Sequence, residues 1–271
     1  MRKILLLLLV LGVSVVPCIG GARNGQWQEK PNWGSYFQAA NVQGCFLLYD
    51  LQADAYFSYN SSRVNIGFLP ASTYKIFNSL VALETGAVRD ESEVLKWDGV
   101  PRMVPVWNQD QSMREAIKYS TVWFYQEMAR RIGPDQMQHY VNAANYGNRD
   151  ISGGIDHFWL DGALRITAKE QIDLLVKLHR NQLPFSPRTI NIVKDILINE
   201  KAEKYVLRAK TGWAGLGDNS VPQIGWWVGY VEREGQAYFF AMNIDIKKEE
   251  DAAARRTITQ NILREMQIIE P

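Results

Sequence analysis

Short apolar runs near both ends of the chain carry the clearest strand patterns. They are rich in Val, Phe, Tyr and Trp, as β-strands usually are. They predict two strands within residues 44–59, a strand at 204–210, and a hairpin of 223–232 and 237–245 that turns at Glu234-Gly235. A short helix within 23–42 and a final helix over 252–266 are expected beside these strands.

Helical patterns fill the middle of the chain. Helices are predicted from Ser72 to about Glu84, with Gly86 past the end, and over 112–132, 134–143, 168–182 and 187–199. The resulting fold class is α+β and sandwich-like: an antiparallel β-sheet built from both chain ends and flanked by helices. A mainly helical subdomain, about 62–200, is inserted into a single domain of residues 23–271.

The first residues resemble a signal peptide, predicted as residues 1–22. Three residues with two basic side chains precede an apolar run of 13 residues, 4–16, and small residues follow at 20–22. The run is short for a bilayer span, which needs about 20 residues. We therefore expect export to the periplasm or the medium, without stable membrane insertion after cleavage. The alternatives are an uncleaved anchor or a lipoprotein site at Cys18, which Pro17 disfavours.

Charge and composition exclude several classes of function. The net charge is +1, and basic patches interleaved with aromatic residues are absent, so nucleic acid is not an expected partner. Cys45 is the only cysteine after residue 22, which excludes an internal disulfide, and its apolar surroundings predict burial. The three histidines show no metal-binding spacing, so no metal site is expected. The protein is expected to be a monomer or a homodimer.

A serine and a lysine three residues apart, Ser72 and Lys75, are the first candidates for chemistry. Three residues on a helix rise about 4.5 Å, which places both side chains on one face. A serine needs a base to become a nucleophile, and a buried, neutral lysine can be that base. The apolar residues around the pair predict that Lys75 is buried. The Ser-x-x-Lys pattern also occurs by chance on solvated helices.

Three later motifs strengthen the functional interpretation of Ser72 and Lys75. Ser120-Thr121-Val122, Tyr146-Gly147-Asn148 and Lys210-Thr211-Gly212 are each weak alone. Ser-x-x-Lys followed by a serine-containing triad and Lys-Thr-Gly is the motif set of serine β-lactamases and penicillin-binding proteins. The ordered set therefore indicates acyl transfer at Ser72.

The chain resembles the class D, or oxacillinase-type, β-lactamases. The motifs that carry the resemblance span essentially the whole chain after residue 22: Pro70-Ala71-Ser72-Thr73-Tyr74-Lys75, Ser120-Thr121-Val122, Tyr146-Gly147-Asn148, Phe158-Trp159-Leu160, Lys210-Thr211-Gly212 and Trp226-Trp227-Val228-Gly229, with Lys96-Trp97-Asp98-Gly99 as a further familiar segment. One departure is Tyr74, where the class usually has Phe.

The resemblance implies a role for each motif. Lys75 would be N-carboxylated by carbon dioxide or bicarbonate, with Trp159 as the partner of the carbamate, and no other cofactor is implied. One base would then serve both acylation and deacylation. Ser120 would pass a proton to the leaving nitrogen of the β-lactam, and Lys210 would supply positive charge beside it.

The resemblance also implies how the substrate is held. The backbone N–H groups of Ser72 and Trp213 would form the oxyanion hole. Arg255 would bind the substrate carboxylate, assisted by Thr211 and Gly212. The residues expected to line the pocket are Trp107, Val122, Leu160 and Trp213.

Three functions share this chemistry. The leading interpretation is hydrolysis of penicillin-type antibiotics, which confers resistance. A β-lactam sensor or penicillin-binding protein would acylate without turnover, and sensors often carry Tyr at the position of Tyr74. A cell-wall transpeptidase or carboxypeptidase is the third. The chain shows no transmembrane or signalling segment beyond the expected signal peptide, which favours the hydrolase.

Overall fold

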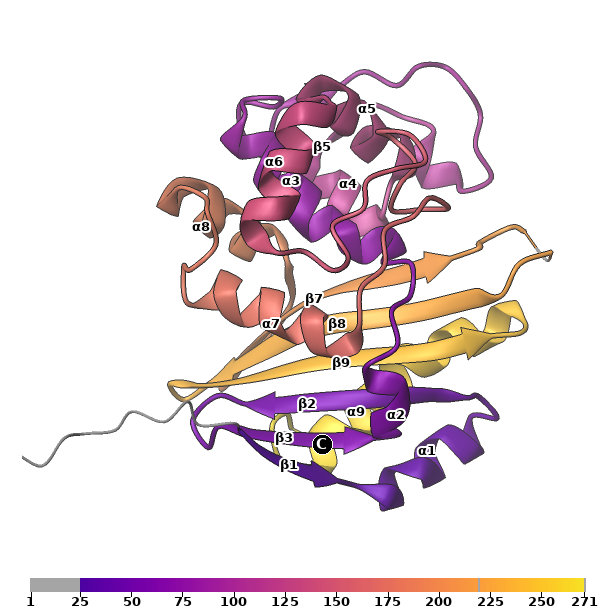
Figure 1. The fold of residues 1–271 in the computed structure, drawn as a ribbon, viewed down its shortest axis with the longest axis vertical. Helices are drawn as coiled ribbons and strands as arrows, with labels where there is room; N and C mark the ends of the chain where they lie inside the picture. Colours follow the sequence, from indigo (N-terminus) through magenta and orange to yellow (C-terminus); the bar gives the residue numbers. More distant parts are fainter. Residues whose placement is uncertain (1–24, 219, 271) are drawn as a thin grey trace, which may run out of the picture.

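A seven-stranded sheet forms the middle layer of the protein (Figure 1). The computed structural model describes residues 25–218 and 220–270, so the predicted signal peptide and Cys18 lie outside it. The strand order is β1-β3-β2-β9-β8-β7-β6. The strands are β1 (Gln26–Glu29), β2 (Gly44–Asp50), β3 (Ala55–Tyr59), β6 (Ile198–Lys201), β7 (Tyr205–Ala214), β8 (Gln223–Arg233) and β9 (Gln236–Ile246).

The sheet joins the two ends of the chain, as the sequence predicts. Strand β2 pairs antiparallel with β9, and Leu47 lies opposite Ala241. The predicted α+β class and the β8–β9 hairpin are confirmed. The two edge strands were not predicted. Strand β1, which is parallel to β3, and strand β6 are four residues long and contain no buried residue, so they lack a buried apolar face that a sequence pattern could reveal.

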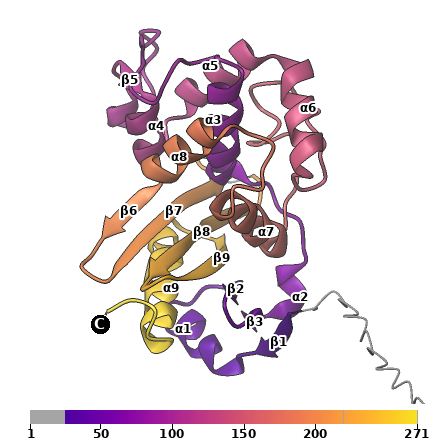
Figure 2. The same ribbon diagram turned by 90° about the vertical axis from the view of Figure 1, so that its left-hand side faces the viewer.

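One face of the sheet is covered by α1 (Gly34–Ala39) and α9 (Ala254–Glu265) (Figure 2). The 3₁₀ turns η1 (Pro31–Trp33) and η4 (Glu249–Ala253) lead into these helices. Trp33 and Phe37 pack with Trp227 of β8 and Ile262 of α9 in one hydrophobic cluster. Burial of these side chains holds both chain ends against the same face.

The other face carries the remaining helices. They are α2 (Ser61–Val64), α3 (Lys75–Glu84), α4 (Met113–Tyr119), α5 (Val122–Ile132), α6 (Pro134–Ala144), α7 (Ala168–His179) and α8 (Pro187–Ile196), with the 3₁₀ turns η2 (Ala71–Tyr74) and η3 (Pro105–Trp107) and the small β4 (Val94–Leu95)–β5 (Gln111–Ser112) ladder. Helix α3 is the central one, because every residue from Lys75 to Leu83 is buried. Within the described ranges, no helix is long and apolar enough to span a bilayer.

The predicted helix over 112–132 is wrong in one respect, because it is broken at Ser120. A capping box between Ser112 and Glu115 starts α4, and Ser120 ends it with a left-handed φ of 60°. Helix α5 then starts at Val122. A non-glycine residue in this conformation is uncommon, and it turns the Ser120 side chain out of the regular helix. The predicted helix 187–199 likewise ends earlier, at Ile196, where the chain enters β6.

Candidate active site

The turn that carries Ser72 is held in an unusual backbone conformation. Ala71 has a left-handed φ of 47°, and its N–H donates to the Trp159 carbonyl over 3.0 Å. The N–H of Thr73 donates to the Pro70 carbonyl over 3.1 Å. Strained residues of this kind persist where the surrounding structure fixes them. They place Ser72 in the 3₁₀ turn that feeds directly into α3.

Ser72 and Lys75 meet as the helical spacing predicts. The Lys75 Nζ lies 2.8 Å from the Ser72 Oγ, and it sits 5.3 Å from the centre of the Tyr125 ring. Lys75 is completely buried, and this burial lowers the pKa of its amine to about 7. The interior disfavours the charged ammonium. A substantial fraction of Lys75 is therefore neutral near pH 7 and able to accept the hydroxyl proton.

A second serine–lysine pair completes the polar centre. The Lys210 Nζ donates to the Ser120 Oγ over 2.9 Å and to the Thr211 carbonyl over 3.0 Å. Burial holds the pKa of Lys210 well below its ordinary value, and the positive charges of Lys75 and Arg255 add to this shift. Ser120 therefore touches a group that can exchange a proton with it.

The two serines open into one cavity of about 920 Å³. Of the residues predicted from the sequence, the structure brings nine to its wall: Ser72, Trp107, Ser120, Val122, Leu160, Thr211, Gly212, Trp213 and Arg255. Lys75 and Lys210 are buried and reach the cavity through their serines. Sequence reasoning missed the apolar rim formed by Met103, Leu216 and Val221, because these residues lie in irregular segments without a motif.

Strand β7 and helix α9 supply the opposite wall. A Cβ at Gly212 would lie 2.9 Å from the Pro70 carbonyl, so only glycine lets β7 approach the Ser72 turn this closely. The Arg255 Nη1 donates to the Gly212 carbonyl over 2.5 Å, and the guanidinium lies 5.5 Å from the Trp213 ring centre. Burial lowers the pKa of Arg255 to about 10, so it remains cationic at neutral pH. The indole of Trp213 donates to Gln223 over 2.8 Å.

Trp159 lies beside the Ser72 helix but outside the cavity wall. Its ring is fully buried and stacks on Tyr74, with ring centres 5.4 Å apart and planes at 22°. Its indole N–H is buried and has no hydrogen-bond partner among residues 25–218 and 220–270. The Tyr74 hydroxyl donates to the Met137 sulfur over 2.9 Å. That bond commits the hydroxyl to α6, so Tyr74 contributes its ring rather than its hydroxyl to this region.

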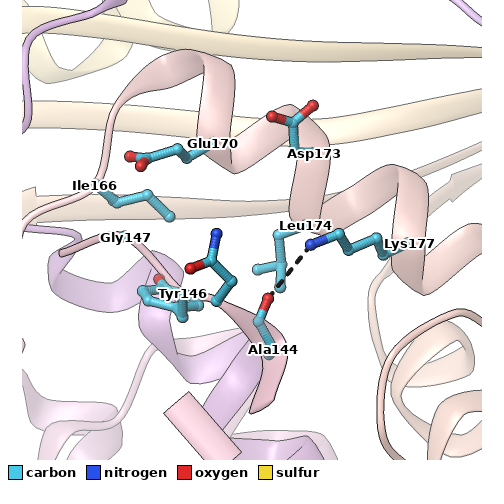
Figure 3. A pocket seen from close by; sticks show the side chains of 9 residues that line it. Ala144, Tyr146, Gly147, Ile166, Glu170, Asp173, Leu174 and Lys177 are labelled. Carbon is cyan, nitrogen blue, oxygen red and sulfur yellow. Dashed lines mark hydrogen bonds between the residues drawn. The ribbon is translucent and has the colours of Figure 1, made fainter. Parts of the chain in front are cut away.

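The Tyr146-Gly147-Asn148 motif holds a loop closed instead of lining the large cavity. The Asn148 side chain donates to the Ala163 carbonyl over 2.9 Å and accepts the Arg165 N–H over 3.0 Å. A separate cavity of about 60 Å³ lies behind the motif, where Lys177 donates to the Ala144 carbonyl over 3.4 Å (Figure 3). The two cavities share no lining residue.

The remaining candidates for chemistry lie elsewhere. Cys45 is fully buried in β2, and burial raises the pKa of its thiol to about 12, so it stays protonated. No group of three His, Cys, Asp or Glu side chains in the described part of the chain could hold a metal ion.

A protein-family model and several known proteins match most of the chain. The penicillin-binding protein transpeptidase domain model matches residues 36–264. The chain is 43% identical to beta-lactamase OXA-48 of Klebsiella pneumoniae, covering 99% of this chain and 100% of that protein. It is 40% identical to beta-lactamase OXA-10 of Pseudomonas aeruginosa, covering 94% and 96%.

Solved structures agree with these relatives. The class D β-lactamase YbXI from Nostoc is 48% identical and superposes with a TM-score of 0.85, covering 89% of this chain and 100% of that chain. The class D β-lactamase FUS-1 (OXA-85) from Fusobacterium nucleatum subsp. polymorphum is 40% identical, with a TM-score of 0.86 and the same coverage.

Proposed function

The chain belongs to the class D β-lactamases, serine hydrolases that open β-lactam rings and confer resistance, and on this premise we propose how its own residues perform the reaction. Ser72 attacks the carbonyl carbon of the β-lactam, and the bond between that carbon and the ring nitrogen breaks. A water molecule then releases the product acid and restores the Ser72 hydroxyl. Penicillin-type antibiotics are the proposed substrates.

One observation carries the proposal. The Ser72 Oγ opens into the 920 Å³ cavity and lies 2.8 Å from a buried lysine amine whose pKa is about 7. A general base works best when its pKa is near the working pH and its atom is within hydrogen-bond reach. Lys75 meets both conditions for removing the Ser72 proton.

The surroundings of Lys75 also fit a carbamate formed with carbon dioxide. Carbon dioxide adds only to a neutral amine, which burial provides at Lys75. The buried, unpartnered indole N–H of Trp159, among the residues described, is a donor suited to an anionic oxygen. When bound, carbon dioxide would supply a carbamate base for both acylation and deacylation, so we propose N-carboxylation of Lys75 with no other cofactor.

Ser120 and Lys210 handle the proton that the leaving nitrogen needs. Their contact of 2.9 Å allows the Ser120 hydroxyl to donate to the ring nitrogen and to be reprotonated from Lys210. The backbone N–H groups of Ser72 and Trp213 are the proposed oxyanion hole, in which one donor contributes a factor of about 10² to 10³ in rate. Together these groups let the same cavity support bond breaking and charge stabilisation.

Arg255 is the proposed anchor for the carboxylate that β-lactams carry. Its guanidinium lines the cavity beside Thr211 and Gly212, the remaining proposed substrate contacts of strand β7. A buried cation of this kind forms strong charge-assisted hydrogen bonds with a carboxylate. Trp107, Val122 and Leu160 supply apolar wall for the substrate body.

A turnover assay tests the proposal. The protein lacking residues 1–22 is mixed with a chromogenic cephalosporin, with and without bicarbonate. We expect many turnovers, stimulation by bicarbonate, and loss of activity in Ser72→Ala and Lys75→Ala. A single stoichiometric burst that leaves a stable adduct would instead identify a sensor or penicillin-binding protein.

Two further properties are proposed with this function. Residues 23–271 are exported, which cell fractionation tests, and the protein is a monomer or a dimer, which light scattering tests.

A further inference from the structure

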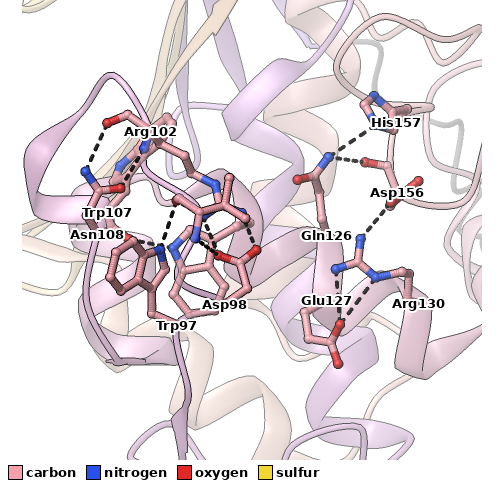
Figure 4. A network of polar contacts seen from close by, with 12 residues as sticks. Trp97, Asp98, Arg102, Trp107, Asn108, Gln126, Glu127, Arg130, Asp156 and His157 are labelled. Carbon is pink, nitrogen blue, oxygen red and sulfur yellow. Dashed lines mark hydrogen bonds and ion pairs between the residues drawn. The ribbon is translucent and has the colours of Figure 1, made fainter.

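The loop that carries Trp159 is fastened to helix α5 by two side chains (Figure 4). The Arg130 Nη1 donates to the Asp156 carboxylate over 2.7 Å. The Gln126 amide donates to the Asp156 carbonyl over 3.2 Å. Gln126 and Arg130 are four residues apart on α5 and therefore lie on one helix face. Asp156 is thus held through both its side chain and its backbone.

Asp156 and Trp159 belong to one compact turn. The Phe158 N–H donates to the Gly154 carbonyl over 2.9 Å, and the Leu160 N–H donates to the His157 carbonyl over 2.8 Å. The Trp159 carbonyl accepts the N–H of Ala71, the residue before Ser72. Because these bonds tie the turn together, a shift at Asp156 moves the Trp159 indole.

The same helix contacts Lys75 with a different face. Tyr125 of α5 lies with its ring centre 5.3 Å from the Lys75 Nζ, and its carbonyl accepts the Asn78 side chain of α3 over 3.2 Å. Helix α5 therefore holds the Trp159 turn with one face and the Lys75 amine with another. The relative placement of Trp159 and Lys75 depends on α5 through these contacts.

We propose that Arg130 is a positioning residue that acts through Asp156: it sets the affinity of Lys75 for carbon dioxide by fixing the Trp159 turn against α5, where Gln126 also holds the Asp156 carbonyl. This inference rests on the proposed carboxylation of Lys75. The Arg130–Asp156 pair is partly exposed, with 48% and 26% of the two side chains accessible, and such pairs are weak. We therefore expect its loss to weaken carbon dioxide binding by about two- to fivefold and to leave the fold intact.

The test measures the carbamate directly. The protein lacking residues 1–22 is titrated with ¹³C-bicarbonate at fixed pH, and the carbamate signal is followed by NMR. Arg130→Met and Asp156→Asn are expected to raise the bicarbonate midpoint by about two- to fivefold, and the double variant by no more than the larger single effect. Arg130→Lys, which retains the charge, is expected to recover part of the affinity. Asp156→Asn removes little volume, so it remains informative if Arg130→Met folds poorly.

Arg131 provides a matched control. It shares the Glu127 partner of Arg130 but bonds the Ala87 carbonyl instead of the Trp159 turn. Arg131→Met should leave the midpoint at the wild-type value. An unchanged midpoint in both Arg130→Met and Asp156→Asn, with a clear wild-type carbamate signal, overturns the positioning role alone. Absence of any wild-type carbamate signal overturns the proposed carboxylation and this inference together.

Discussion

Two tryptophans in the described part of the chain, Trp159 and Trp227, bury indole N–H groups without a hydrogen-bond partner. An unpaired buried donor costs about 1–3 kcal/mol, so each of these indoles could gain from an acceptor that the described side chains do not supply. Trp159 stacks on Tyr74 beside the Ser72 turn, whereas Trp227 packs under α9 on the other face of the sheet. Of the two, only Trp159 lies beside the Ser72 turn and the helix that carries Lys75.

Replacement of each indole by a phenyl ring separates these two roles. Trp159→Phe keeps an aromatic ring on Tyr74 but deletes the N–H donor. We expect it to raise the bicarbonate requirement and to slow deacylation more than acylation, because the proposed base is then less occupied. Pre-steady-state kinetics at several bicarbonate concentrations measure both steps. Trp227→Phe is the control and should lower stability without changing the bicarbonate requirement; an equal effect of both changes would contradict the role of Trp159.

The low pKa of Lys75 predicts a pH profile with a definite sign. The amine is neutral above its pKa of about 7 and takes up a proton as the pH falls below it. Carbon dioxide cannot add to the ammonium form, so at constant dissolved carbon dioxide the carbamate should be lost on acidification. Forming the carbamate from the ammonium releases two protons, one from the amine and one on addition of carbon dioxide, so turnover should fall by as much as about a hundredfold per pH unit below about pH 6. Rates measured at buffered carbon dioxide test this, and a profile that stays flat to about pH 5 would disprove it.

At the scale of elements, the sequence predicts those helices and strands that carry a periodic apolar pattern or a motif. Helix α3 and the β8–β9 hairpin are found because their apolar faces are long. Edge strands β1 and β6 are missed because they are short and every residue in them is exposed, so they show no alternation of buried and exposed positions. The break at Ser120 is missed because the apolar pattern continues through it and only tertiary contacts favour the left-handed residue.

The Arg130–Asp156 contact could not be predicted from the sequence pattern either. The two residues are 26 positions apart, and Asp156 lies in an irregular turn without periodicity. Motifs located Ser72, Lys75, Ser120 and Lys210 because the chemistry restricts those residue types. The side chains that merely hold the motifs in place are not restricted in the same way, so only the folded geometry reveals them.

At Gly147 two irregular segments, those of Gly147 and Arg165, approach each other closely. This close approach gives a prediction. A Cβ at Gly147 would lie 2.1 Å from the Arg165 carbonyl, and its φ is 49°. Gly133 has a φ of 76°, but a Cβ there would meet nothing within 4 Å. Gly133 has a ψ of 163°, so it lies in a region that only glycine occupies readily, and Gly133→Ala should cost about 1–3 kcal/mol for the backbone conformation alone. Gly147→Ala should cost more, about 3 kcal/mol or above, because the loop must also move away from the added Cβ.

Urea unfolding of the two glycine variants measures this difference. Gly147→Ala should also raise the bicarbonate requirement, because Arg165 and the Trp159 turn are parts of the same loop. Gly133→Ala should leave that requirement unchanged. Equal unfolding free energies for the two variants would show that the loop is not held at Gly147.

At the scale of the whole molecule, the sheet separates two hydrophobic cores. Alternate residues of β8 point into different cores, with Trp226 on the helical side and Trp227 under α9. The site lies between the helical layer and the sheet, since Ser72 and Lys75 come from the first and Lys210 from the second. The outer layer of α1 and α9 supports the sheet from behind and, apart from Arg255, stays out of the cavity wall.

Glu265 ties this outer layer together. Its carboxylate accepts hydrogen bonds from the Asn32 amide over 3.1 Å, the Trp33 indole over 3.0 Å and the Tyr36 hydroxyl over 2.8 Å. These donors lie near the start of the described chain, and Glu265 ends α9. The carboxylate therefore closes the N-terminal segment onto the C-terminal helix.

Glu265→Ala tests whether the two cores act independently. It removes three hydrogen bonds and leaves the indole N–H of the fully buried Trp33 unpaired, so we expect unfolding to become easier by about 1–3 kcal/mol. Glu270→Ala is the control, because Glu270 has only a long 3.7 Å ion pair with Lys204 to lose, which is worth less than about 1 kcal/mol. In both variants the bicarbonate midpoint and the turnover of folded protein should match the wild type, since Glu265 lies at the end of α9 farthest from Arg255 and the Ser72–Lys75 pair is on the other side of the sheet. A shifted midpoint in Glu265→Ala would show that the outer layer controls the geometry at Lys75.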